Sequence, residues 1–224
     1  MRYENGQPLD RVLKEHTTLP EARIVKILLD VMDGLEQVHE AGFIHRDIKP
    51  ANIYLRDDES ALLIDFGSAR QALGIQTQTL TTLVSPGYSP FEQYYSDGAL
   101  QGPWTDIYAL GATAFRAMTG RAPMPAVDRS RVLLTSLPDS IHEALSTSIG
   151  YSAGFLNAVE AAIAFQGKDR PQSITDWRAA LADDGVAPPV VASALPKSVA
   201  LDIDLGSATQ SPSTVDPDAV TEVL

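Results

Sequence analysis

The longest periodic pattern in the sequence lies between Thr18 and Gly42. Its apolar residues recur every three or four positions, at Ile24, Leu28, Val31, Leu35 and Val38. This spacing is typical of one face of an amphipathic helix. Residues 18–21 match a capping box with a proline in the first turn, and Gly42 is a typical helix stop. The pattern therefore predicts one long helix with a buried face.

Shorter patterns follow this helix. Two apolar runs, 53–55 and 61–64, flank the polar residues 56–60, which predicts a β-hairpin. Helical spacing returns at 106–118, ended by Gly120, and again near 152–166 and 173–182, where Trp177 and Leu181 are the expected buried positions. The polar, threonine-rich stretch 68–95 has no period and is longer than an ordinary connection, as functional loops often are. The sequence thus predicts an α+β fold that is mainly helical.

The C-terminal residues 183–224 differ from the rest in composition. They contain seven of the acidic residues, a single base (Lys197) and no aromatic residue, and they are rich in Pro, Ser, Ala and Val. Such a segment has too little apolar surface to offset the entropy lost on folding. We therefore expect a folded domain over 1–182 and a disordered acidic tail over 183–224.

Charge and composition exclude several function classes. The net charge of -12 argues against a nucleic-acid partner, because phosphate backbones require clustered Lys and Arg. The absence of cysteine excludes disulfides, thiolate metal sites and cysteine nucleophiles. No apolar stretch approaches the ~18 residues of a membrane span, and the first residues lack a signal-peptide layout, so we expect a cytoplasmic protein. His16, His39 and His142 stand alone, and we expect them to be solvated or paired locally.

Three motifs occur in a fixed order along the chain. The segment His45-Arg-Asp-Ile-Lys-Pro-Ala-Asn52 follows the long helix, Asp65-Phe-Gly67 follows the second strand of the hairpin, and Pro86-Gly-Tyr-Ser-Pro-Phe-Glu92 closes the long loop. Together they resemble the H-R-D-x-x-x-x-N, D-F-G and A-P-E motifs of the protein kinase family, specifically bacterial-type serine/threonine kinases. The resemblance covers about 1–182 and implies the mainly helical large lobe of a kinase, with a short β-hairpin.

The resemblance implies ATP and Mg²⁺ as cofactors and a protein as the substrate. Asp47 would orient the attacking hydroxyl and Lys49 would contact the γ-phosphate, while Asn52 and Asp65 supply the hard oxygen ligands that Mg²⁺ prefers. Ser85 matches the hydroxyl residue that contacts the catalytic Asp and Lys in serine/threonine kinases. The remaining contacts to ATP would come from the backbone at Arg2 and Glu4 and from Tyr54.

Other matched positions are structural or regulatory. Asp106 would hold the catalytic loop through its backbone N–H groups, and Glu92 would pair with Arg170. The rings of His45 and Phe66 would stack, next to Gly67. Arg46 could receive a phosphate carried by a threonine of the long loop, or that loop could be unregulated. The candidate threonines are Thr77, Thr79, Thr81 and Thr82.

The sequence also departs from the family pattern. Residues 1–4 resemble the hinge between the kinase lobes, and no G-x-G-x-x-G loop, V-A-I-K lysine or partner glutamate is found. We therefore expect a large lobe with the small lobe missing, little activity alone, and an apolar face that a partner could cover. One hypothesis is a serine/threonine kinase that needs a small lobe, and the other is a non-catalytic remnant that binds a partner as a pseudokinase-like scaffold.

Overall fold

The structure is a computed structural model that describes residues 5–66, 70–71, 84–95 and 98–182. These residues all belong to the first of the two units of the chain, Met1–Pro188. In the described part, no helix is both long and apolar enough to cross a membrane.

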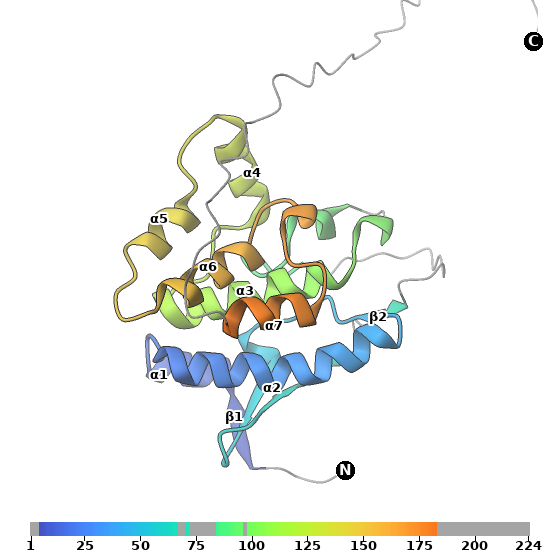
Figure 1. Cartoon of the computed structure of the whole chain (residues 1–224), viewed down its shortest axis with the longest axis vertical. Helices are drawn as coiled ribbons and strands as arrows, with labels where there is room; N and C mark the ends of the chain where they lie inside the picture. The colour runs from blue at the N-terminus through green and yellow to red at the C-terminus, as the bar shows by residue number, and fades with distance from the viewer. Residues whose placement is uncertain (1–4, 67–69, 72–83, 96–97, 183–224) are drawn as a thin grey trace, which may run out of the picture. The chain divides into compact units, whose positions relative to one another are not determined.

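Four helices form the centre of the described region (Figure 1). They are α2 (Glu21–Glu40), α3 (Pro103–Thr119), α6 (Ala153–Ala162) and α7 (Ile174–Ala182). Helix α3 is buried on nearly every side and packs against the other three. A Cβ atom at Gly111 would lie 2.8 Å from that of Ala162, so glycine is what permits α3 and α6 to approach so closely.

The core lies between these helices and one face of a small sheet. It includes Leu28 and Leu35 of α2, Leu110 of α3 and Trp177 of α7, all almost fully buried. Large apolar side chains of this kind each stabilise the fold by about 1.5–3 kcal/mol when removed from water. The same packing fixes α3 beneath the loop that carries the first motif.

Two small antiparallel sheets flank that loop. The first has the order β1-β3-β4, with β1 (Gly6–Pro8), β3 (Ile53–Arg56) and β4 (Ala61–Leu63). In its register Tyr54 lies opposite Leu62, and Ile53 lies opposite Leu63. The second sheet pairs β2 (Phe43–Ile44) with β5 (Arg70–Gln71).

Short elements complete the described region. They are α1 (Leu9–Glu15), α4 (Ala126–Leu134), α5 (Ser140–Ser146), and the 3-10 helices η1 (Pro50–Asn52), η3 (Phe91–Tyr94), η4 (Gly98–Leu100) and η5 (Gly167–Asp169). None of these was predicted from the sequence, nor were β1, β2 and β5. They have fewer than ten residues each, too few for a periodic pattern to stand out.

The predicted long helix, the hairpin and the helix over 106–118 are confirmed, with three corrections. The capping box at Thr18 is wrong, because Pro20 is the N-cap and the Glu21 carboxylate instead accepts bonds from the backbone N and Oγ of Ser152, at 2.5 and 2.7 Å. The helix expected to reach 166 ends at Ala162. The stretch 68–95 is not entirely irregular, since it contains β5 and η3.

Candidate active site

One buried carboxylate binds the backbone of the loop between β2 and β3, residues 45–52. Asp106 of α3 is fully buried, and its two oxygens accept hydrogen bonds from the backbone N–H groups of His45 and Arg46, both at 2.8 Å. Arg46 has a φ of 69°, a region that is costly for a residue with a side chain. Asp106 therefore fixes a loop conformation that the backbone would not otherwise favour.

His39 of α2 is a third partner of Asp106. Its Nε2 lies 2.8 Å from Asp106 Oδ2, and its side chain is almost completely buried. The expectation that His39 is solvated or paired locally is wrong, because its partner lies 67 positions away in the sequence. No local pattern reveals such a contact. The only hint in the sequence was that His39 lies in the last turn of the helix that leads into the motif.

The Asp47 side chain projects from this loop into a cluster of donors. Its carboxylate lies 2.8 and 2.9 Å from Lys49 Nζ and accepts a hydrogen bond of 2.9 Å from Ser85 Oγ. Lys49 Nζ also donates to Ser85 Oγ, at 3.1 Å. The amide nitrogen of Asn52 donates to Asp47 Oδ2 at 2.9 Å and to the Asp47 backbone oxygen at 2.7 Å. We call these four residues the Asp47 cluster.

The hairpin register brings Asp65 next to this cluster. The backbone N–H of Ile64 donates to the backbone oxygen of Asn52 at 2.9 Å, so Asp65 follows directly after the position opposite Asn52. Asp65 has a φ of 63°, which is uncommon for aspartate and is typical of functional sites. The chain thus carries two hard-oxygen side chains at neighbouring backbone positions.

This donor set suits a magnesium ion that is completed by other ligands. Asp47 holds the nitrogen side of the Asn52 amide, so the amide oxygen is the atom that a cation would take. Among the described residues, no group of three or more His, Cys, Asp or Glu side chains could hold a metal by itself. Mg²⁺ needs about six oxygens and usually takes most of them from phosphates and water. The residues therefore fit Mg²⁺ bound together with a phosphate ligand.

Three residues with rings, His45, Tyr54 and Phe66, lie within two positions of Asp47, Asn52 or Asp65 in the sequence. The rings of His45 and Phe66 lie 4.8 Å apart in an edge-to-face arrangement. Tyr54 shares with Leu62 the face of the β1-β3-β4 sheet opposite the core, and both Leu62 and Phe66 are exposed. Leu62 and Phe66 therefore expose apolar surface.

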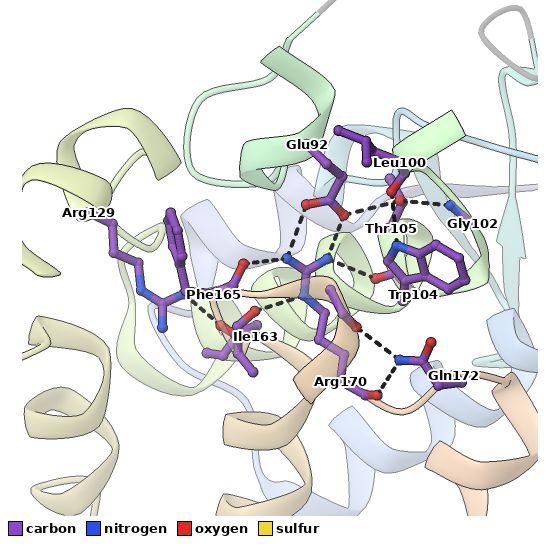
Figure 2. A network of polar contacts seen from close by, with 12 residues as sticks. Glu92, Leu100, Gly102, Trp104, Thr105, Arg129, Ile163, Phe165, Arg170 and Gln172 are labelled. Atoms are coloured by element: carbon purple, nitrogen blue, oxygen red, sulfur yellow. Dashed lines mark hydrogen bonds and ion pairs between the residues drawn. The ribbon is translucent and has the colours of Figure 1, made fainter. Parts of the chain in front are cut away.

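Glu92 and Arg170 form a buried pair at the far end of the long loop (Figure 2). Two Arg170 nitrogens lie 2.6 and 3.2 Å from the two Glu92 oxygens. The same guanidinium donates to the backbone oxygens of Ala164, Phe165 and Trp104, at 2.7, 2.8 and 3.2 Å. The pair thus ties η3 to the start of α3 and to the segment before α7.

Gln93, next to Glu92, was not singled out from the sequence. Its side chain is buried and donates to the backbone oxygen of Arg46 at 2.8 Å. Asp106 therefore holds the backbone of Arg46 on its N–H side, and Gln93 holds it on its carbonyl side.

Some sequence-based candidates lie outside the described residues. They are Arg2, Glu4, Gly67, Thr77, Thr79, Thr81 and Thr82. The predicted disordered tail, 183–224, also lies outside them.

Comparison with known proteins identifies the family. The model of the protein kinase domain matches residues 1–162. The chain belongs to the protein kinase family.

Several bacterial kinases are similar to this kinase chain. It is 33% identical over 183 residues to serine/threonine-protein kinase PknK of Mycobacterium tuberculosis, covering 79% of this chain and 16% of PknK. It is 37% identical over 130 residues to serine/threonine-protein kinase F of Synechocystis, covering 56% of this chain and 26% of that protein. The solved structure of PpkA-294 in its apo form matches with a TM-score of 0.66 and 32% identity, over 80% of this chain and 61% of that one. The kinase chain therefore spans less than half the length of these curated relatives.

Proposed function

We propose that this chain is the large lobe of a serine/threonine protein kinase, which transfers the γ-phosphate of ATP to a hydroxyl of a protein. The observation that carries the proposal is the Asp47 cluster. A carboxylate, an ammonium, an amide and a hydroxyl meet within 2.7–3.1 Å on a loop that Asp106 holds in place. Family membership and the bacterial serine/threonine kinases among its relatives support the same reading.

The chemistry of the four residues suits phosphoryl transfer. Asp47 would accept the hydrogen bond of the acceptor hydroxyl and take its proton as the oxygen bonds to phosphorus and the bond to the leaving ADP oxygen breaks. Lys49 would place its ammonium against the transferred phosphoryl group. Ser85 contacts both side chains, so it would keep them aligned.

Asn52 and Asp65 would hold Mg²⁺ through oxygen atoms. When bound, the ion would neutralise charge on the phosphate oxygens during transfer. Tyr54 would contact the adenine from the exposed face of the β1-β3-β4 sheet, together with the backbone at Arg2 and Glu4.

We further propose that transfer requires a small lobe, contributed by a longer polypeptide or by a separate chain. The 224 residues contain no G-x-G-x-x-G segment to cover the phosphates. Such a partner would cover the sheet face that carries Tyr54 and Leu62, together with the exposed ring of Phe66. In this proposal residues 1–182 form the lobe, 183–224 form a tail, and the protein acts in the cytoplasm.

The test is a transfer assay with a small lobe supplied. The chain is fused behind the small lobe of one of its bacterial relatives and given radiolabelled ATP, Mg²⁺ and peptides that carry Ser, Thr or Tyr. We expect labelling of Ser and Thr peptides, and its loss in the Asp47→Asn variant. A fusion that folds and binds ATP but labels no peptide would contradict the proposal. If a protein partner captured by the chain alone is also retained by Asp47→Asn, the non-catalytic scaffold would be the better description.

A further inference from the structure

A small pocket lies directly beside the Asp47 cluster. It has a volume of about 220 Å³ and is lined by residues from four parts of the fold: Asp10, Leu13, Lys14, Lys49, Pro50, Ala51, Tyr88 and Arg116. Lys49 belongs both to this lining and to the cluster. Pockets that hold a whole small-molecule ligand are usually larger, about 300–1,000 Å³, so this one suits a single side chain.

The pocket is connected to the cluster through a tight turn. The backbone N–H groups of Tyr88 and Ser89 both donate to the backbone oxygen of Ser85 at 2.9 Å, and Ser89 Oγ accepts from Ser85 N at 3.0 Å. Ser85 contacts Asp47, while Tyr88, three residues later, lines the pocket. A peptide with its hydroxyl at Asp47 would therefore place a neighbouring side chain at the pocket.

The charge of the pocket is opposite to that of the chain. Its lining contains three cationic side chains and one carboxylate, although the net charge of the chain is -12. Two of the cations have partners, since Lys14 lies 3.0 Å from Asp10 and Lys49 lies 2.8 Å from Asp47. Arg116 is the third.

Arg116 is partly buried without a counter-ion. Its guanidinium donates to the backbone oxygens of Thr17 and Leu13, both at 3.2 Å, and no carboxylate in the described part of the chain lies within ion-pair distance of it. In contrast, the buried guanidiniums of Arg129 and Arg170 each contact a carboxylate, at 2.6 Å. Guanidinium has five N–H donors, so Arg116 can bind a further acceptor while its present bonds stay intact.

Tyr88 reports the same electrostatic environment. Burial raises the pKa of its phenol, and Asp10 raises that pKa further while Arg116 lowers it. The tyrosine hydroxyl is thus neutral at physiological pH and can donate a hydrogen bond. It can share an incoming carboxylate with Arg116 as a hydrogen-bond donor.

We propose that this pocket binds an acidic side chain of the protein substrate, close in sequence to the phosphorylated residue. Arg116 is the specificity-determining residue. The substrate carboxylate accepts a charge-assisted hydrogen bond from its guanidinium and serves as the counter-ion that the guanidinium lacks. This inference rests on the proposed function for its biological meaning, but the binding step needs neither ATP nor a small lobe.

The test measures peptide binding to the whole 224-residue chain without ATP. Fluorescent serine peptides, each with one Glu moved along the positions around the serine, are compared by anisotropy with matched Gln and Lys peptides. We expect one Glu position to bind about tenfold tighter than its Gln match, and Lys there to bind most weakly. Affinity that follows total peptide charge irrespective of the Glu position would overturn the proposal.

Charge variants test the role of Arg116 itself. Arg116→Glu should reverse the preference towards Lys at that position, and Arg116→Lys should keep part of the Glu preference. Arg131→Glu, at an exposed position on α4, is the matched control and should leave the preference for Glu over Lys unchanged. An unchanged Glu preference in Arg116→Glu would overturn the proposal.

Arg116 also bonds to two backbone oxygens, so a measurement without substitution is needed. In the unmodified chain the Arg116 Nε–H NMR signal should shift on addition of the Glu peptide and stay in place with the Gln peptide; an equal response to both would contradict the proposal. The transfer assay separates the two claims. Transfer without a Glu preference rejects the pocket alone, and a Glu preference without transfer rejects the kinase proposal alone.

Discussion

Asp47 and Asp106 are two aspartates that contact the same loop in different ways. Asp106 is fully buried and accepts hydrogen bonds from two backbone N–H groups and from His39. Asp47 is 8% exposed, and within the described residues its carboxylate accepts hydrogen bonds only from side chains, those of Lys49, Asn52 and Ser85. Backbone donors fix a conformation, whereas side-chain donors can rearrange around a substrate.

The comparison extends to the groups around each aspartate. Asp106, His39 and the Glu92–Arg170 pair form what we call the scaffold contacts, which are buried and join distant segments. The Asp47 cluster lies within two neighbouring segments, and one of its members, Lys49, lines the pocket. We therefore expect changes in the scaffold contacts to lower stability, and changes in the Asp47 cluster to lower transfer with little loss of stability.

The largest effect should come from Arg170→Ala. It leaves the largely buried Glu92 carboxylate without its cationic partner, which typically costs about 3–5 kcal/mol of unfolding free energy. Arg178→Ala is the control, because it removes the exposed pair with Asp33 and should cost about 0–1 kcal/mol. Urea unfolding measures both, and equal losses would mean that burial does not distinguish the two pairs.

Within the Asp47 cluster, Lys49→Met should lower transfer more than any change except one at Asp47 itself. Loss of the lysine charge should lower transfer about 10²–10³-fold in the fusion with a small lobe, as for other lost electrostatic contacts. Stability should fall less than in Arg170→Ala, because the lysine side chain is 30% exposed and Asp47 keeps its hydrogen bonds from Asn52 and Ser85. Lys168→Met, at an exposed position, should leave transfer unchanged. A large loss of stability in Lys49→Met would place this residue among the scaffold contacts.

Asp106→Asn should lower both the stability of the fold and the rate of phosphoryl transfer. The amide offers one acceptor oxygen where the carboxylate serves donors with both, so at least one buried donor loses its partner. We expect a loss of about 1–3 kcal/mol of unfolding free energy, together with weaker transfer because the loop is no longer fixed. Urea unfolding and the transfer assay check this, and unchanged stability would contradict the role given to Asp106.

Ser85→Ala should lower transfer less than Lys49→Met does. It removes a hydroxyl that both donates to Asp47 and accepts from Lys49, and one such bond is worth about 1 kcal/mol, or about fivefold in transfer. Ser146→Ala on α5 removes a hydroxyl bonded only to its own helix and should not alter transfer. A loss in Ser85→Ala as large as in Lys49→Met would show that the hydroxyl does more than align its neighbours.

The smallest expected effect on stability comes from the exposed pair of His142 and Glu160. The hydrogen bond between these two side chains, at 2.6 Å, raises the pKa of the His142 imidazole. A raised folded-state pKa stabilises the fold below about pH 6.5, and this contribution is lost as the pH rises through the folded-state pKa. Because the pair is exposed, we expect at most about 1 kcal/mol. Urea unfolding across this range should show the loss, and Glu160→Gln should abolish it.

The sequence predicted elements whose signal is local. Helices α2 and α3 have enough turns for the apolar period to be evident, and the hairpin has alternating strands around a polar turn. The sequence missed distant contacts that lie outside the family motifs. Glu21 bonds to Ser152 rather than capping its own helix, and His39 contacts Asp106 across the fold.

The candidate site shows the same division. The resemblance to the kinase family named the members of the Asp47 cluster, because they lie within or next to two short segments that match its motifs. The pocket was not foreseen, since its lining combines residues of α1, the loop, the turn at Tyr88 and α3. Arg116 in particular appears in the sequence only as one of the two charged residues of α3, the other being Asp106.

The most direct test of the difference between the two aspartates is to measure stability and transfer in the same Asp47→Asn protein. We predict a loss of only about 1 kcal/mol of unfolding free energy, because the donors around Asp47 are side chains, which can turn to other acceptors when one oxygen becomes an amide nitrogen. Transfer in the fusion with a small lobe should fall by about 10²–10⁴-fold, the usual contribution of a positioned acid or base. A protein that keeps its transfer activity, or that loses it only because it unfolds, would contradict the assignment of Asp47 as the residue that positions the acceptor hydroxyl.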